Sequence, residues 1–224
     1  LKDDPEYQIT LVYDWFVKCR QVRFCSTNSL IPCFVDISIY DRAAENSKRA
    51  NDRLRQLRIE LMDFFDKNEH EFSFWKDNPW MFHPDSGLSV QCGDVDLEAQ
   101  RTVVSSAEID LVQSVFDSFN EKAHALGLLT DEPHGDFAYA IDNVFDAPKR
   151  KIIWDRNDIL PVRKHPFGGF SFSVPAKAEK VADACYPGWP YMPMDICGHD
   201  HFAKDVLSDP DVRSAMAKFV VECN

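Results

Sequence analysis

A short stretch of alternating side chains, followed directly by a helical repeat, constrains the fold of this chain most. Over residues 33–40, Val35, Ile37 and Ile39 point to one side of an extended strand, and the residues between them point to the other. The following segment, 43–66, repeats Leu and Phe at intervals of three and four, which predicts a long helix. The two segments together indicate a protein that combines strands and helices.

Two further segments add to this pattern. Residues 7–17 are apolar and aromatic and fit either a strand or a short helix. Residues 106–126 carry one apolar stripe at helical spacing. Ser105 and Glu108 form the sequence pattern of a capping box at the start of this helix, and Gly127 is placed to end it.

The last third of the chain predicts a hairpin between short helices. The Gly pair at 168–169 is typical of a tight turn, and residues 170–174 alternate as a second strand. A short helix is expected after Pro175. A final helix is expected to begin at Asp209, because Pro is favoured in the first turn.

No repeat or linker divides the chain. Its 224 residues are within the size of one large domain, and the 17 Phe and five Trp predict an aromatic core. Residues 68–100 form one long polar excursion. We therefore expect a single domain spanning residues 1–224, of the α/β (α+β) class, with a C-terminal hairpin and helix.

Composition limits the possible partners. The chain has 37 Asp and Glu against 25 Lys and Arg, a net charge of −12, which disfavours binding to nucleic acid or to anionic membranes. No apolar run is long enough for a transmembrane segment. The seven Cys are an odd number, so at least one thiol is free or pairs with another chain. The absence of an N-glycosylation sequon favours the cytoplasm.

The first candidate site is the strand with alternating residues. Asp36 lies in its middle and Asp41 at its end. Carboxylates on strands hold Mg²⁺ in phosphoryl-transfer sites, because this cation prefers oxygen ligands and bridges phosphates. The alternative is that Asp36 is a hydrogen-bonded core residue, since a charge beside aromatic side chains needs a partner.

A second acidic motif follows a possible short strand. Asp94 and Asp96 are separated by one residue, so both carboxylates point to the same side of an extended chain. This arrangement suits a divalent metal. An exposed acidic turn or the start of a helix explains the motif equally well.

The third candidate is a zinc site. Sulfur and imidazole are the ligands that zinc prefers, and Cys185, Cys197, His199 and His201 lie close together in the sequence. Their spacing matches no standard zinc finger. The alternative is therefore a chance cluster.

A cationic run precedes the predicted hairpin turn. Arg163, Lys164 and His165 are adjacent, and clustered cations on a hairpin can hold a phosphate. A solvated strand surface is the alternative.

Two stretches of the chain together resemble the LicD/fukutin family of phospho-group transferases. They cover about a third of the chain, and they occur in the order in which the family has them. The first consists of Asp4-Pro5-Glu6-Tyr7, residues 34–41 and the Arg-rich helix that follows; the second consists of Trp154, residues 158–169, Val174-Pro175 and residues 186–189.

The resemblance implies a nucleotidyltransferase-like mixed sheet flanked by helices. It implies transfer of a phospho-alcohol, such as phosphocholine or ribitol phosphate, from a CDP-activated donor to a glycan acceptor, with Mg²⁺ or Mn²⁺ as cofactor. Asp36 matches the family's metal carboxylate on the later strand, and Asp41, Arg163 and Lys164 are the further candidate catalytic residues. A eukaryotic member would act in the Golgi lumen.

One part of the family pattern has no counterpart in the printed sequence. The family carries its other acidic residues on an earlier strand, which would precede Asp4. We therefore expect the chain to be N-terminally incomplete.

Two functions of other classes remain open. A non-catalytic acidic module, for example an inhibitor, would use the net charge of −12 to bind a basic protein. A zinc-stabilised structural domain would use the Cys and His cluster.

Overall fold

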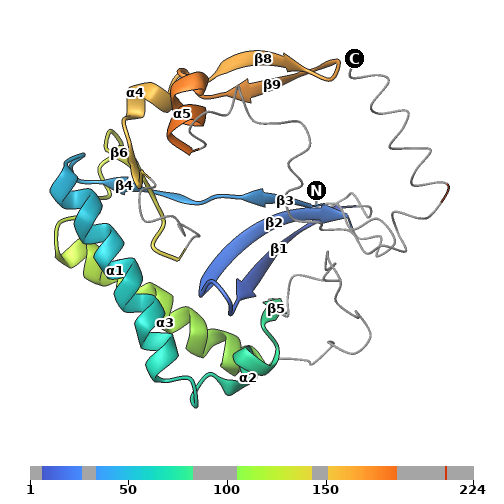
Figure 1. Ribbon diagram of the computed structural model, residues 1–224, viewed down its shortest axis with the longest axis vertical. Coiled ribbons are helices and arrows are strands. Elements are labelled where there is room, and N and C mark those ends of the chain that lie inside the picture. Colours follow the sequence, from blue (N-terminus) through green and yellow to red (C-terminus); the bar gives the residue numbers. More distant parts are fainter. Residues whose placement is uncertain (1–6, 27–33, 83–104, 143–150, 186–209, 211–224) are drawn as a thin grey trace.

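The computed structural model describes residues 7–26, 34–82, 105–142, 151–185 and 210. This part of the chain is a mixed α and β structure with small antiparallel sheets and five helices, which confirms the expected class (Figure 1). The strands are β1 (Tyr7–Asp14), β2 (Cys19–Ser26), β3 (Phe34–Ile37), β4 (Tyr40–Ala43), β5 (Trp80–Phe82), β6 (Asp136–Tyr139), β7 (Ile153–Trp154), β8 (Arg163–Phe167) and β9 (Phe170–Val174). The helices are α1 (Lys48–Lys67), α2 (Ser73–Asp77), α3 (Ser106–Ala125), α4 (Arg156–Ile159) and α5 (Ala178–Cys185).

The largest described sheet is built on a long hairpin. Strands β1 and β2 pair along their whole length, and the order of the sheet is β3-β2-β1-β5. Residues 7–17, which fitted a strand or a helix, therefore begin as strand β1. The register places Tyr13 opposite Arg20, and Arg23 opposite Asp36. The two side chains of each pair therefore lie on the same face of the sheet.

The alternating stretch is two strands rather than the single strand expected over 33–40. β3 pairs with β2 in the first sheet, whereas β4 pairs with β6 in a second sheet of order β4-β6-β7. Ser38 and Ile39 lie between them. Val35 and Ile37 are 61% and 42% exposed, so the apolar side of β3 is not buried.

Helices α1 and α3 cover the core (Figure 1). Each helix buries one apolar face, as predicted, but Phe64 of the predicted α1 stripe is 37% exposed and the adjacent Phe65 is buried instead. The aromatic core is confirmed as well: Phe65 packs edge-on against Phe72 and Trp75, with ring centroids 4.9 and 5.0 Å away. The fully buried residues of the two stripes are Leu54, Leu57, Leu61 and Phe65 on α1, and Ile109, Val112 and Phe116 on α3.

Capping residues define the ends of the long helices. The capping box of Ser105 and Glu108 is present, and Gly127 follows α3 with a φ of 65°, a left-handed value that favours Gly. Helix α1 begins at Lys48, later than expected, with the Ser47 side chain accepting from Ala50 N. It begins late because residues 40–43 pair in β4.

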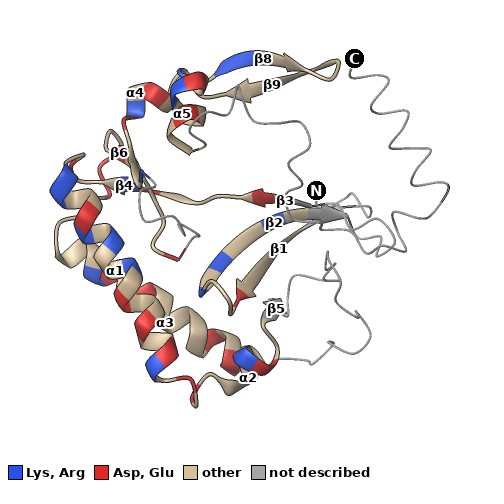
Figure 2. Cartoon of the chain, viewed as in Figure 1, with Lys and Arg blue, Asp and Glu red and all other residues tan. Residues whose placement is uncertain are grey.

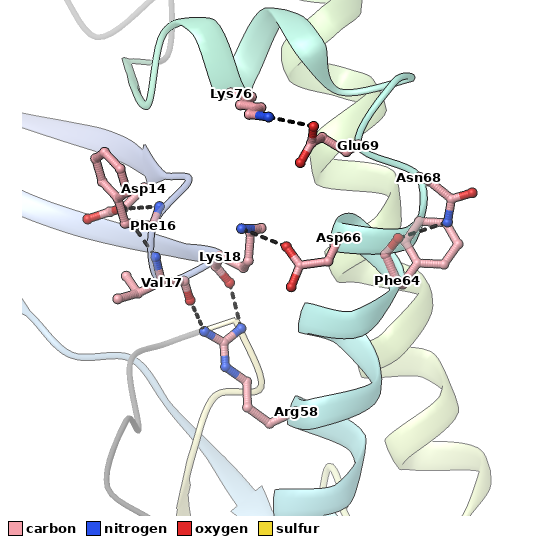
Figure 3. Close-up of polar contacts among 10 residues, drawn as sticks. All are labelled: Asp14, Phe16, Val17, Lys18, Arg58, Phe64, Asp66, Asn68, Glu69 and Lys76. Carbon is pink, nitrogen blue, oxygen red and sulfur yellow. Dashed lines mark hydrogen bonds and ion pairs between the residues drawn. The ribbon is translucent and has the colours of Figure 1, made fainter.

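Polar contacts with α1 hold the turn between β1 and β2 in place (Figure 3). The buried guanidinium of Arg58 donates to the main-chain oxygens of Val17 and Lys18. The ammonium of Lys18 lies 3.0 Å from Asp66 of the same helix. Arg58 is therefore buried, although Arg side chains on a long helix usually face solvent, because the hairpin covers it.

The predicted hairpin near the C-terminus is also present. Strands β8 and β9 pair from Arg163 opposite Val174 to Phe167 opposite Phe170, with Gly168 and Gly169 in the turn, and α5 follows. The excursion at 68–100 contains α2 and β5 in its described part. The helix expected from Asp209 falls almost wholly outside the described residues.

None of the described helices combines the length and the apolar character that crossing a membrane requires. The domain boundaries and the localisation stay predictions.

Candidate functional site

Asp36 lies on the edge strand β3 and is held by a cation of the neighbouring strand. Arg23 Nε donates to Asp36 Oδ1 at 2.8 Å, and the carboxylate side chain remains 46% exposed. The expectation of a charge buried beside aromatic residues is therefore wrong, because the described surroundings of Asp36 include solvent and an Arg. An oriented and accessible carboxylate of this kind can bind a cation or a hydrogen-bond donor.

Asp41 lies in a different environment, at the second sheet. Its Oδ2 is buried and accepts no hydrogen bond from the described residues. Burial raises the pKa of this carboxyl group, and the nearby carboxylate of Asp142 raises it further, whereas His124 and Arg20 oppose the shift. A desolvated carboxyl beside a second carboxylate is the arrangement that retains a proton.

Asp142 is the neighbour that determines this environment. It follows β6, is 5% exposed, and binds Arg20 of β2 through its side chain and its main chain. Arg20 Nε donates to Asp142 Oδ2 at 2.6 Å, and Arg20 Nη1 lies 3.6 Å from Asp117 of α3. The pair therefore joins the first sheet, the second sheet and α3 at one point.

Tyr13 completes this polar cluster. Its hydroxyl donates to Gln113 Oε1 of α3 at 3.0 Å. Burial raises the pKa of Tyr13 to about 12, while the charge of Arg20 acts in the opposite direction. Tyr13 therefore stays protonated at physiological pH and serves as a hydrogen-bond donor.

The two cations expected to be catalytic lie on the β8–β9 hairpin. Arg163 is paired with Glu179 of α5 at 2.6 Å, and Lys164 donates to the neutral hydroxyl of Ser173 at 3.0 Å. Figure 1 shows this hairpin well separated from β3. In the described part of the chain, Arg163 and Lys164 therefore do not share a site with Asp36.

The remaining expected ligands mostly lie outside the described residues. Asp94 and Asp96 are among these, as are Cys197, His199 and His201. Cys185 is the one member of the zinc cluster that the structure describes. It ends α5 and carries a free, half-buried thiol.

The described donors determine whether a divalent metal fits at Asp36. Mg²⁺ and Mn²⁺ prefer several oxygen ligands. Asp36 contributes one carboxylate, and Arg23 already binds one of its oxygens. Among residues 7–26, 34–82, 105–142 and 151–185, no group of three or more acidic, His or Cys side chains is arranged to hold a metal. The described residues alone thus do not fit this cofactor.

Sequence reasoning did not single out Arg20 or Asp142. A carboxylate directly after the apolar run 137–141 was a usable signal for Asp142, since such a residue must leave the core or find a partner. Arg20 had no comparable signal. Its role comes from the pairing of β1 with β2, which places it opposite Tyr13.

Comparisons with known proteins identify no relative of this chain. No family model, no curated protein and no solved structure matches the chain significantly. The site is therefore interpreted from its own residues and from the sequence resemblance described above.

Proposed function

We propose that this protein transfers a phospho-alcohol from a CDP-activated donor to a glycan acceptor, as the LicD/fukutin family does. Asp36 is the residue that carries the proposal. It is the carboxylate that matches the family motif, and it combines an edge-strand position, an orienting Arg23 and an accessible side chain. A nucleotidyltransferase-like arrangement of the sheets is part of the same proposal.

The order of the elements supports this assignment. The described part of the first resembling stretch corresponds mainly to β3, β4 and α1, and that of the second lies in β7, α4 and the β8–β9 hairpin. The described residues of the two stretches thus lie mostly in strands and helices.

The proposed function includes Mg²⁺ or Mn²⁺, but the described residues supply only part of a site for either cation. A site for either cation would need oxygen ligands in addition to Asp36, because one carboxylate that already pairs with Arg23 binds such a cation weakly. The role assigned to the described chain is therefore limited to one oriented carboxylate. Asp41 is buried away from such a role and is proposed as a proton-holding neighbour instead.

The proposal is tested with CDP-choline and CDP-ribitol, each with Mn²⁺. A ligand that binds only the folded state raises the melting temperature, so a thermal-shift titration detects donor binding. Release of CMP in the presence of a glycan acceptor measures transfer. We expect the wild-type protein to respond to one of the two donors and Asp36→Asn to lose the transfer activity.

Asp52→Asn provides the matched control, because Asp52 is also an exposed carboxylate in an ion pair, with Lys48 of α1. It should leave both assays unchanged. Full transfer activity in Asp36→Asn, or no response of the wild-type protein to either donor, rejects the proposal.

The acidic-module alternative predicts an exposed acidic patch. Figure 2 shows Lys and Arg interspersed with Asp and Glu along α1, so this described helix is not acidic throughout. The thermal-shift titration separates the two functions, because a protein-binding module has no reason to respond to a CDP-alcohol. Metal analysis of the purified protein tests the zinc alternative.

A further inference from the structure

The β8–β9 hairpin exposes three Phe side chains on one face. In its register, Phe167 lies opposite Phe170, and His165 lies opposite Phe172, so the three aromatic rings share a side of the ribbon. Phe167 and Phe170 are each 65% exposed and Phe172 is 51% exposed. Their rings contact one another, since the centroid of Phe172 lies 6.2 Å from each of the other two. Large exposed apolar clusters usually mark interaction surfaces.

The turn places two of these rings at the outermost point of the ribbon. Gly168 and Gly169 have φ values of 56° and 78°, which allow the two-residue turn that brings Phe167 and Phe170 side by side. Figure 1 shows the hairpin extending from α4 and α5, with its turn pointing away from them. The tip is therefore an apolar projection.

Cations occupy the same hairpin closer to the helices. Lys164 is three residues before Phe167, a distance of about 10 Å along a strand. It donates to the neutral hydroxyl of Ser173, and this bond does not cancel its charge. Residues 159–178 contain no Asp or Glu, although the whole chain has 37 among 224 residues. Figure 2 accordingly shows blue on β8 and no red on either β8 or β9.

The hairpin thus carries apolar rings at its tip and a cation closer to the helices, and this order suits binding to a lipid surface. Apolar side chains that enter a membrane interface reach about 5–10 Å below the headgroups. A Lys side chain about 10 Å above them then lies at the level of the lipid phosphates. We propose that the tip of the β8–β9 hairpin binds an anionic lipid surface, with Phe167 and Phe170 inserted and Lys164 at the phosphates.

The net charge of −12 opposes this binding only at long range. At physiological ionic strength charges are screened over about 8 Å, so the charges of the hairpin itself dominate at the contact. The nearest acidic residues in sequence are Asp158 and Glu179, and both are paired with Lys or Arg. The proposal does not depend on the transferase activity.

The test uses the full chain and sedimentation with vesicles at physiological ionic strength. We expect binding to vesicles of equimolar phosphatidylcholine and phosphatidylserine, and much weaker binding to phosphatidylcholine alone. The double variant Phe167→Ser/Phe170→Ser should bind at least about tenfold more weakly. Phe16→Ser is the matched control, because Phe16 is 63% exposed at the tip of the β1–β2 hairpin, and it should bind as the wild type does.

Two further variants distinguish a loss of lipid binding from misfolding of the hairpin. Lys164→Glu keeps the aromatic cluster and should weaken binding at least about fivefold. Phe170→Trp should retain binding and show a blue shift of its fluorescence with the mixed vesicles. Absence of wild-type binding, or equal binding by the double variant, overturns the proposal. Self-association that the double variant loses, without vesicle binding, overturns it as well and assigns the surface to a second copy of the chain.

Discussion

Arg20 and Asp142 bind each other twice, although 122 residues separate them in the sequence. The main-chain N of Arg20 donates to the oxygen of Asp142 at 2.7 Å, and its Nε donates to the carboxylate at 2.6 Å. The side chain of Asp142 is 7% exposed and that of Arg20 is 17% exposed. This pair joins β2 of the first sheet to the residue that follows the end region of β6 in the second sheet.

Removing the cation of this pair should destabilise the fold strongly. Arg20→Met leaves the buried carboxylate of Asp142 without its partner, which costs about 3 kcal/mol in the free energy of unfolding. Urea denaturation measures the loss. Lys48→Met breaks the exposed pair with Asp52 and should cost less than about 1 kcal/mol. Similar losses in the two variants would contradict the role assigned to Arg20.

Asp41→Asn should stabilise the protein at neutral pH. The raised pKa of Asp41 means that the folded state holds this proton more tightly than the unfolded chain. Stability is therefore greatest below the ordinary carboxyl pKa and declines as the pH rises through the raised value. Asn cannot ionise and removes this decline. Melting temperatures from about pH 4 to about pH 8 should diverge with rising pH; parallel curves would contradict the prediction.

Arg58→Met should open the β1–β2 turn. The guanidinium donates to the carbonyls of Val17, Lys18 and Ile141, and these lose a buried donor together. A loss of about 3 kcal/mol is expected. Cys19, the first residue of β2 after this turn, has a buried thiol, and burial raises its pKa.

Two measurements check this change. Thermal unfolding reports the stability, and mass spectrometry of alkylated peptides reports whether Cys19 reacts faster. Arg53→Met is the control on the exposed face of the same helix and should alter neither. Arg58→Lys should resemble Arg58→Met, because an ammonium cannot reproduce the forked donors of a guanidinium.

Asp158→Asn should loosen the base of the β8–β9 hairpin. The buried carboxylate binds Lys177 at 2.7 Å and Lys180 at 2.6 Å, and both hydrogen bonds lower the pKa of Asp158. The contribution to stability is therefore present above the ordinary carboxyl pKa, and it is lost as the pH falls through the lowered value. Asn should cost about 1–2 kcal/mol at neutral pH and about nothing in acid.

Hydrogen exchange of β8 and β9, with melting curves at both pH values, tests this prediction. Asp183→Asn is the control, because Asp183 is an exposed carboxylate of the following helix α5. Equal protection of the hairpin in wild type and Asp158→Asn would show that the ion pairs do not hold its base.

Local chemistry made part of this structure predictable. The capping box at Ser105 and the Gly pair at 168–169 act within a few residues, and both have the expected effect. The apolar stripes of α1 and α3 are equally local, because helical spacing alone determines which side chains share a face.

The predictions that failed concern features that depend on contacts between residues distant in the sequence. Nothing near Val35 indicates that its strand leaves the first sheet after Ile37, because β6 determines where β4 pairs. Arg58 looks like any other Arg on α1 until the β1–β2 turn covers it. Among the candidate site residues, the surroundings of Asp36 depend on Arg23, and those of Asp41 depend on Asp142.

Residues 34–43 form β3 of the first sheet and β4 of the second. The length of the connection between these two strands is therefore critical. Side chains alternate along a strand, so one residue inserted between Ile37 and Tyr40 would require β4 to shift its register against β6 or turn its side chains over. Asp41 would then move relative to Asp142, while Asp36 kept its place beside Arg23. Ser38 and Ile39 therefore act as a fixed spacer, and insertions or deletions at this point should be tolerated far less than substitutions.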